Sequence, residues 1–295
     1  MRGSRRESAE WATSHPPSVA AVDVLIPTAG RRAELAATLA GLAAQDDPGF
    51  RVVISDQSLA DSIEECAAVN QMVRLLRAQG REVIVDRHLP RRGLAEQRQH
   101  LLSMAVSPRA LFLDDDVWLE PGCIARMADA LDTLGCGFVG SAVQGLSYLD
   151  DERPEQRHAF EPWGDAVEPE RLGPDHPAMA RVHLHSAANV THLAAEVTVP
   201  SRGWLAYKVA WVGACVMFRR EMLVTCGGFD FWSDLPPVHS GEDVAAQWRV
   251  MERYGGAGIL PSGAVHLESP TTVPVRDVDV ATRLRGAEQR GEPTT

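Results

Sequence analysis

The chain has 295 residues, a formal net charge of -11 and 45% hydrophobic residues, which is enough apolar material for one large domain or two small ones. The acidic balance argues against nucleic acid as the main partner, because phosphate backbones are bound by clustered lysines and arginines. An acidic protein that holds an anionic ligand needs a metal ion or local arginines to do so.

Five cysteines are scattered along the chain without Cys-x-x-Cys pairs, a pattern typical of free thiols in a reducing compartment. The longest nearly apolar stretch, 204–218, is interrupted by Lys208 and is too short to span a bilayer. The charged N-terminus lacks the apolar segment of a signal peptide. We therefore expect a cytoplasmic protein with no integral membrane segment.

Residues 1–20 carry Arg, Ser, Glu and a Pro pair without a hydrophobic period, so we expect a flexible leader. A β-rich run over 21–26 predicts the first strand, and the segment 27–30 (Pro-Thr-Ala-Gly) ends it. Leucines at helical spacing between 35 and 42 then predict a helix.

The same pattern repeats along the next segment. A strand is predicted over 51–55 with Asp56 at its end, a helix over 63–79, a third strand over 82–85 and a further helix opened by 91–93. Alternating strands and helices with short connections indicate a parallel sheet wound by right-handed crossovers. No Gly-x-Gly-x-x-Gly or Walker A sequence occurs, which argues against a nicotinamide-binding Rossmann domain and a P-loop ATPase.

The fourth predicted strand, 110–113, is followed directly by Asp114, Asp115 and Asp116, and a helix is expected over 124–134. Ligands of open α/β sheets bind at the carboxyl ends of the strands. Three neighbouring carboxylates repel one another unless they share a cation, and oxygen ligands suit Mg2+ or Mn2+. The alternative is a solvated acidic turn that caps the next helix.

The hydrophobic period weakens beyond Gly140, and the segment 150–200 is rich in Pro, Glu and His. We expect an irregular insert there, since long segments of low regularity are usually functional or mobile. A buried strand is predicted over 209–218, and a short helix over 219–226 is stopped by two glycines.

Glu242 and Asp243 open the last predicted helix, and the helix dipole favours the anionic form of acids in a first turn. A terminal strand is expected over 258–260, and His266 follows it. The tail from 276 onward is expected to be polar and loosely packed.

The motifs named above stand in a fixed order: residues 24–28 (Val-Leu-Ile-Pro-Thr), Asp56, residues 91–98, the D-x-D run Asp114-Asp115-Asp116, residues 227–230 (Gly-Gly-Phe-Asp) and the E-D pair Glu242-Asp243. With them the chain resembles the family 2 glycosyltransferases of the GT-A fold. The resemblance implies an α/β fold with a mostly parallel central sheet, helices on both faces and an irregular acceptor-side insert. It implies a single domain over 21–275, with a nucleotide-sugar-binding half (21–140) and an acceptor-binding half (141–275), before a polar tail (276–295).

The resemblance also implies a hexosyltransferase-like, metal-dependent, inverting enzyme that moves a sugar from a nucleotide-diphosphate donor to an acceptor hydroxyl. Mg2+ or Mn2+ would act as a Lewis acid on the leaving diphosphate. Asp116 is implied as its ligand, and His266 as a further metal or diphosphate contact. The resemblance implies that Asp56 contacts the nucleobase of the donor and Asp114 its nucleoside sugar. The other implied donor contacts are Pro27, Thr28, Arg31, Arg91, Arg98 and Asp115.

Inverting transfer needs a base that takes the proton of the acceptor hydroxyl. Asp243 is our first candidate and Glu242 our second, and the helix N-terminus is expected to keep either one ionised. Trp232 and His239 lie in a Pro-rich loop that is longer than the family's usual link. We expect both to contact the acceptor, with the Trp232 ring stacking on a sugar or an apolar group.

Structural alternatives exist for several of these residues. Asp56 could be a turn or capping acid, the 242–243 pair could merely cap a helix, and His266 could be a structural histidine. Three histidines between 183 and 192 invite a zinc interpretation, although no Cys or acidic partner stands at ligand spacing.

Two other functions stay open. A nucleotidyltransferase that makes nucleotide sugars shares this sheet type and metal chemistry, but it would need a Gly-rich, Arg-containing loop after the first strand. Residues 27–32 are a poor version of that loop. A non-catalytic nucleotide-sugar-binding protein on the same fold is the other, and an intact Asp116 together with an intact Asp243 counts against it.

Overall fold

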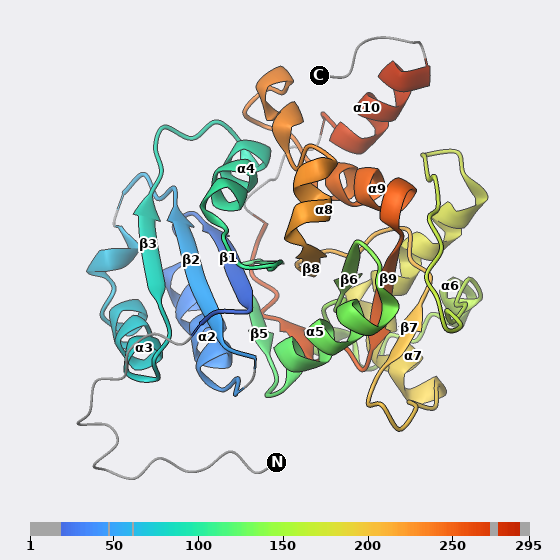
Figure 1. Cartoon of the computed structure of the whole chain (residues 1–295), viewed down its shortest axis with the longest axis horizontal. Helices are drawn as coiled ribbons and strands as arrows, with labels where there is room; N and C mark the ends of the chain where they lie inside the picture. Colours follow the sequence, from blue (N-terminus) through green and yellow to red (C-terminus); the bar gives the residue numbers. More distant parts are fainter. Residues whose placement is uncertain (1–18, 47, 61, 272–276, 290–295) are drawn as a thin grey trace.

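A single eight-stranded sheet forms the centre of the molecule (Figure 1). Its strands are β1 (Val22–Thr28), β2 (Phe50–Asp56), β3 (Val83–Arg87), β4 (Arg109–Leu113), β6 (Phe138–Gly140), β7 (Leu205–Tyr207), β8 (Cys215–Arg219) and β9 (Gly256–Leu260). They are ordered β3-β2-β1-β4-β8-β6-β9-β7. A separate two-stranded sheet pairs β5 (Val117–Leu119) with β10 (Ala264–His266).

The computed structural model describes residues 19–46, 48–60, 62–271 and 277–289, so the leader expected over 1–20 lies outside it except for its last two residues. The α-helices are α2 (Arg32–Ala43), α3 (Ala67–Ala78), α4 (Leu94–Met104), α5 (Cys123–Leu134), α6 (Pro154–Arg157), α7 (Ala187–Glu196), α8 (Arg220–Thr225), α9 (Glu242–Tyr254) and α10 (Val280–Gln289). The 3-10 helices are η1 (Ile63–Glu65), η2 (Leu146–Tyr148), η3 (Pro177–His185) and η4 (Asp230–Asp234).

The predicted α/β fold with a mostly parallel sheet is confirmed. β1 runs parallel to β2 and β4, and β2 runs parallel to β3. β8 is antiparallel to its neighbours β4 and β6, while β6 and β9 are parallel. Because parallel strands end at one edge, Thr28 at the end of β1 lies opposite Asp56 at the end of β2, and the acidic turn after β4 opens beside them.

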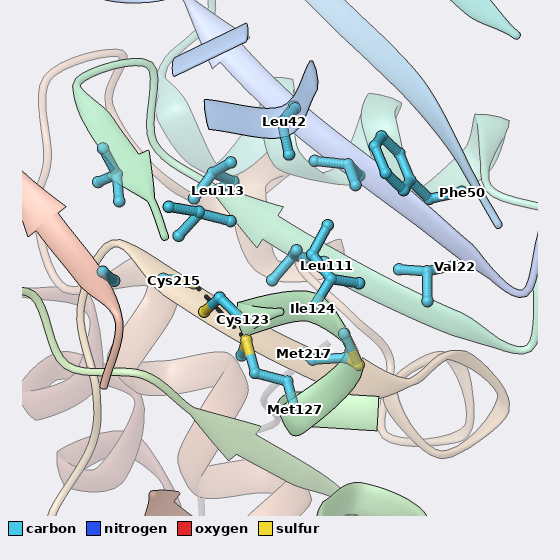
Figure 2. Packing of buried hydrophobic residues seen from close by; sticks show 14 of the residues in the cluster. Val22, Leu42, Phe50, Leu111, Leu113, Cys123, Ile124, Met127, Cys215 and Met217 are labelled. Carbon is cyan, nitrogen blue, oxygen red and sulfur yellow. Dashed lines mark hydrogen bonds between the residues drawn. The ribbon is translucent and has the colours of Figure 1, made fainter. Parts of the chain in front are cut away.

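Helices cover both faces of the sheet, as expected, because alternate strand residues point to opposite faces. Val24 and Ile26 pack in one core cluster with α2, α3 and α5, whereas Leu25 packs in the other with α4, α8 and α9. Figure 2 shows Leu111 of β4 in the first cluster, in the same packed layer as Ile124 of α5. Each fully buried leucine or isoleucine contributes ~1.5–3 kcal/mol relative to an exposed one.

The buried strand predicted over 209–218 is wrong in its first half, since β8 begins only at Cys215. The segment 209–214 is irregular because a side chain replaces the neighbouring strand. The Val212 amide donates to Gln247 Oε1 at 2.8 Å, and Gln247 Nε2 donates to the Val212 carbonyl at 2.8 Å. The second half of the run, 215–218, is buried and has strands as partners, whereas the first half includes the partly buried Trp211, Gly213 and Ala214.

The insert over 150–200 is more regular than predicted. It carries α6, η3 and α7, and Leu184, Val190 and Leu193 of these helices are buried in the second cluster. The described part of the tail, 277–289, is not loosely packed either, because α10 contacts α9 and buries Val280 and Ala281. The division of the chain into a donor half and an acceptor half at residue 140 stays a prediction.

All five cysteines are free, and Cys123, Cys136 and Cys215 are buried, which agrees with the thiol pattern expected from the sequence. In the described ranges, none of the helices combines the length and the apolarity that a bilayer crossing needs. The cytoplasmic location stays a prediction.

Candidate active site

A cavity of about 630 Å3 opens at the carboxyl edge of the sheet. Its lining joins the loop after β1, the acidic turn after β4, the first turn of α9, the 211–214 segment and the end of β10. The predicted site residues among its lining are Pro27, Thr28, Arg31, Arg98, Asp114, Asp115, Asp116, His239, Glu242, Asp243 and His266. Asp56, Arg91 and Trp232 do not line it.

The loop after β1 is joined to the acidic turn by Asp115. The Thr28 hydroxyl donates to Asp115 Oδ2 at 2.7 Å, and Arg31 Nη1 donates to Asp115 Oδ1 at 3.1 Å. Burial raises the pKa of Asp115 to about 6, against the lowering effect of Thr28 and Arg31. Asp115 therefore holds the loop in place through both of its oxygens.

Asp116 is the meeting point of the acidic turn and the end of β10. The antiparallel pairing of β5 with β10 sets His266 opposite Val117, and His266 Nε2 lies 3.4 Å from Asp116 Oδ2. Arg31 Nη1 donates to the same oxygen at 2.6 Å. Burial raises the pKa of Asp116, helped by the charge of Asp114, although His266 and Arg31 lower it.

Arg98 of α4 connects the acidic turn with α9. Its Nη2 donates to Asp114 Oδ1 at 3.0 Å, and its Nε donates to Glu242 Oε1 at 3.1 Å. Burial alone would lower the pKa of Arg98, but the charges of Asp114 and Glu242 raise it by more. The guanidinium is therefore a permanent positive charge between two acids on opposite walls of the cavity.

The first turn of α9 presents its two acids differently. Gly241, with a φ of +79°, leads into Glu242, which is 3% exposed and bound to Arg98. Asp243 is partly buried and lines the cavity. Burial, followed by the charge of Glu242, raises the pKa of Asp243 to about 7. Burial thus opposes the ionisation that the helix N-terminus was expected to favour, and the charge state of Asp243 stays a prediction.

Asp56 and Arg91 lie away from the cavity lining. Asp56 Oδ1 accepts the Ser58 amide at 2.8 Å, and its Oδ2 accepts the Ile63 amide at 3.3 Å. These contacts are those of the turn acid that was the structural alternative for Asp56. Arg91 is exposed and donates through Nε to the Gln57 carbonyl. Their assignment as donor contacts stays a prediction.

His239 and Trp232 have packing partners that account for their positions. His239 Nε2 accepts the Ala95 amide at 3.1 Å in the first turn of α4, and its Nδ1 donates to the Pro236 carbonyl at 2.7 Å. Both ring nitrogens are thus used, although His239 lines the cavity. Trp232 is partly buried against the second core cluster. Acceptor contacts by these two residues stay predictions.

Two aromatic residues of the cavity wall were missed as site residues. Trp211 and His185 both line the cavity, and their ring centroids lie 3.9 Å apart with the planes tilted by 51°. Burial, and then the charge of His183, lowers the pKa of His185 to about 4, so its ring is neutral. The 209–218 run gives one hint, the glycine at 213, which breaks a strand beside Trp211.

The zinc interpretation of the histidines between 183 and 192 finds no support. Within the described ranges, the one group of three His, Cys, Asp or Glu side chains with ligand atoms close enough for a shared ion lies elsewhere, at Asp86, His88 and His100. His185 contacts Trp211 instead.

Asp116 and His266 are spaced to hold a divalent ion, provided that Arg31 Nη1, at 2.6 Å from the same Asp116 oxygen, moves away. Asp116 Oδ2 and His266 Nε2 are 3.4 Å apart, and two adjacent ligands of one ion with bonds of about 2.1 Å lie about 3 Å apart. An ion at this point would also offset the repulsion between Asp114 and Asp116 that raises the pKa of Asp116. With two protein ligands, the remaining positions would belong to phosphate oxygens and water, as Mg2+ prefers.

The comparison with protein families agrees with this site. The family model described as "Glycosyl transferase family 2" matches residues 23–187, more than half of the chain. This span holds the loop after β1 and the whole acidic turn. No curated protein matches the chain closely enough to count as a relative.

Solved glycosyltransferase structures share the fold at low identity. The mannosyltransferase PcManGT of Pyrobaculum calidifontis, in complex with GDP-Man and Mn2+, has 18% identity and a TM-score of 0.53, over 90% of this chain and 64% of that one. TarS 1-349 of S. aureus, in complex with UDP-GlcNAc, has 16% identity and a TM-score of 0.51, over 85% and 60%. The chain thus spans less than two thirds of each. Because the family model matches more than half of the chain, the protein belongs to glycosyl transferase family 2.

Proposed function

We propose that the protein is a metal-dependent, inverting glycosyltransferase that moves a hexosyl group from a nucleotide-diphosphate donor to an acceptor hydroxyl. One observation carries the proposal: the possible metal ligands Asp116 and His266 and the possible base Asp243 line the same cavity. A donor diphosphate held at the first pair would direct its sugar toward the wall that carries Asp243.

The donor side combines a cation site with arginine. The bound ion would act as a Lewis acid on the leaving diphosphate. Arg31 lies within 2.6 Å of Asp116 Oδ2, so its guanidinium is placed to turn from that carboxylate to a phosphate oxygen. Arginine suits this task because its planar donor group matches phosphate oxygens. The bound GDP-Man and UDP-GlcNAc of the two related structures support a nucleotide-sugar donor.

The general base that deprotonates the acceptor hydroxyl is better assigned to Asp243 than to Glu242. A general base works best when its pKa lies near the working pH, and the pKa of Asp243 is raised to about 7. Glu242 is buried and its Oε1 accepts from Arg98 at 3.1 Å. Asp243 would take the proton of the acceptor hydroxyl as the oxygen attacks the anomeric carbon, and Glu242 would hold Arg98.

The acceptor wall is better assigned to Trp211 than to Trp232. Trp211 lines the cavity and Trp232 does not. The indole of Trp211 offers an apolar face to a sugar ring or another flat acceptor. His185 supports that face, because the two rings are 3.9 Å apart between their centroids.

A nucleotide screen tests the donor assignment. The full chain is heated with UDP, GDP, ADP or dTDP, each with Mn2+ or with a chelator, and unfolding is followed by fluorescence. A selective ligand stabilises the folded state by mass action. One of the diphosphates should therefore raise Tm when Mn2+ is present and leave Tm unchanged in chelator. Asp116→Asn should remove that shift, and Asp132→Asn, a change at a carboxylate 46% exposed on the surface, should keep it.

Two results would count against the proposal. The first is that none of the four nucleotide diphosphates changes Tm in the presence of Mn2+. The second is that the shift survives undiminished in chelator or in Asp116→Asn, which would remove the metal from the donor site. Transfer itself is then checked by mass spectrometry of the matching nucleotide sugar with a panel of hydroxyl acceptors.

A further inference from the structure

A cluster of two histidines and two carboxylates lies between β3 and α4, away from the cavity lining. We name it the β3–α4 cluster; its members are Asp86, His88, Glu96 and His100. His88 Nε2 lies 2.7 Å from Glu96 Oε1, and His100 Nε2 lies 2.7 Å from Asp86 Oδ2. The two imidazole rings are stacked, with centroids 3.7 Å apart and planes within 7°.

Local structure brings these four side chains together. Asp86 lies in β3, which ends at Arg87, and His88 is the first residue after the strand. Glu96 and His100 are four residues apart on α4 and share one helix face. The His88 amide donates to the Asp56 carbonyl at 3.0 Å, which fixes the chain just after β3.

Two observations indicate that the cluster is a ligand site. Ligand atoms of Asp86, His88 and His100 all lie within 4.8 Å of one another, a grouping that is unique within the described ranges. Glu96 is 8% exposed, and its buried Oε2 has no hydrogen-bond partner. A buried carboxylate oxygen without a partner is costly. Glu96 lies outside the group of three but contacts His88 through Oε1 at 2.7 Å, so rotation of its carboxylate would bring Oε2 to a cation held by those three side chains.

We propose that the β3–α4 cluster binds one divalent transition-metal ion of the zinc class through its two imidazoles and two carboxylates. Imidazole nitrogen suits Zn2+, Co2+ and Ni2+, whereas Mg2+ favours oxygen alone. Two carboxylates balance the charge of the dication. Each neutral ring would carry its proton on Nδ1 and offer Nε2, and small rotations out of the stack would bring the ligands to bonds of about 2.0–2.2 Å.

Such an ion would fasten the carboxyl end of β3 to α4. The connection between them, 88–93, carries Arg91, and α4 carries Arg98 to the cavity on another of its faces. The side chains of His88 and His100 are 23% and 27% exposed, so an ion can enter from solvent. The site is structural and distinct from Asp116 and His266.

Titration of the chelator-treated full chain with Zn2+ and with Co2+ tests the site. We expect one high-affinity equivalent of Zn2+ by calorimetry, and Co2+ absorption bands in the visible region that report tetrahedral nitrogen and oxygen ligation. His100→Gln should weaken this equivalent at least tenfold. Matched controls are His158→Gln, a change at an exposed histidine outside the cluster, and Asp116→Asn, and both should keep it.

The proposal is overturned if the wild-type chain takes up no stoichiometric Zn2+, or if the bound equivalent survives in His100→Gln and disappears in Asp116→Asn. Far-ultraviolet circular dichroism of each variant shows whether it is folded. If His100→Gln does not fold, Glu96→Gln replaces it as the test, since that change keeps the size of the side chain and removes the ligand charge. Unchanged Zn2+ affinity in folded Glu96→Gln would exclude the four-ligand site.

Discussion

Arg98 Nε donates to Glu242 Oε1 at 3.1 Å, while Nη2 of the same guanidinium donates to Asp114 Oδ1 at 3.0 Å. One buried cation thus joins the strand end that carries the acidic turn to the helix that carries the possible base. The distance between the donor side and the acceptor side of the cavity depends on this contact. It links Arg98 to a residue 144 positions further along the chain.

Arg98→Gln should destabilise the protein strongly. The change leaves Glu242, which is 3% exposed, as a buried charge without its cation, and breaking a buried ion pair from one side costs about 3–5 kcal/mol. The free energy of unfolding from urea titration measures this cost. Arg153→Gln is the control, because Arg153 pairs with Asp151 on the surface, and it should leave stability almost unchanged. Equal effects of the two changes would show that Arg98 does not join the two walls.

The donor side of the site could be predicted because its residues follow strands directly. Buried apolar runs end at Thr28 and before Asp114, and a parallel sheet brings such ends to one edge. The fold class followed from the same alternation of strands and helices. The three-residue strands β5, β6, β7 and β10 were missed, since a run that short has no readable period.

The rest of the site depends on contacts between distant segments. Trp211 reaches the cavity because the Gln247 side chain binds both polar groups of Val212 and so replaces a strand neighbour. No local pattern around Trp211 encodes that exchange. His239 was expected at the acceptor, but its ring closes the first turn of α4 through Ala95, a partner that only the tertiary fold supplies.

The transfer rate should rise with pH through about 7. The pKa of Asp243 is raised to about 7 by burial and by the charge of Glu242, and the group must lose its proton before it can accept one from the acceptor hydroxyl. Dependence of kcat/KM on pH, measured with saturating Mn2+, should therefore show an ascending limb near that value. Asp243→Asn should lose turnover while retaining the nucleotide-induced increase in Tm.

A different result would reassign the base. If Glu242→Gln abolishes turnover in a folded protein that keeps its nucleotide shift, and Asp243→Asn retains turnover, then Glu242 is the base. A flat pH profile between 5 and 9 in the wild-type protein would mean that no group with a pKa near 7 acts as the base.

Asp243→Asn should gain stability relative to the wild-type protein as pH rises from 5 to 8, measured as the difference between their free energies of unfolding. The pKa of Asp243 is about 7 when folded, against an ordinary value of 3.8. Between these values the folded state binds more protons than the unfolded state, so wild-type stability falls as pH rises through this window. Asparagine has no proton to lose. Urea unfolding of both proteins at pH 5 and at pH 8 measures the difference, and a difference that is constant with pH would contradict the raised pKa.

Trp211→Ala should impair the acceptor step and leave the donor step nearly intact. Trp211 lines the cavity together with Asp243, whereas Trp232 lies outside the lining and packs on the core. Loss of an aromatic stacking contact with a sugar is worth ~1 kcal/mol, so KM for the acceptor should rise about fivefold or more. Donor KM and the nucleotide shift in Tm should change little.

Trp232→Ala is the matched control, since it removes the same kind of side chain from a position outside the cavity lining. It should lower Tm, because part of the core cluster loses its packing, and it should leave the acceptor KM near the wild-type value. The opposite outcome would be an acceptor KM that is raised in Trp232→Ala and unchanged in Trp211→Ala. It would show that the acceptor contacts the loop before α9, as expected from the sequence. Equal increases in both variants would mean that the acceptor extends from the cavity over that loop.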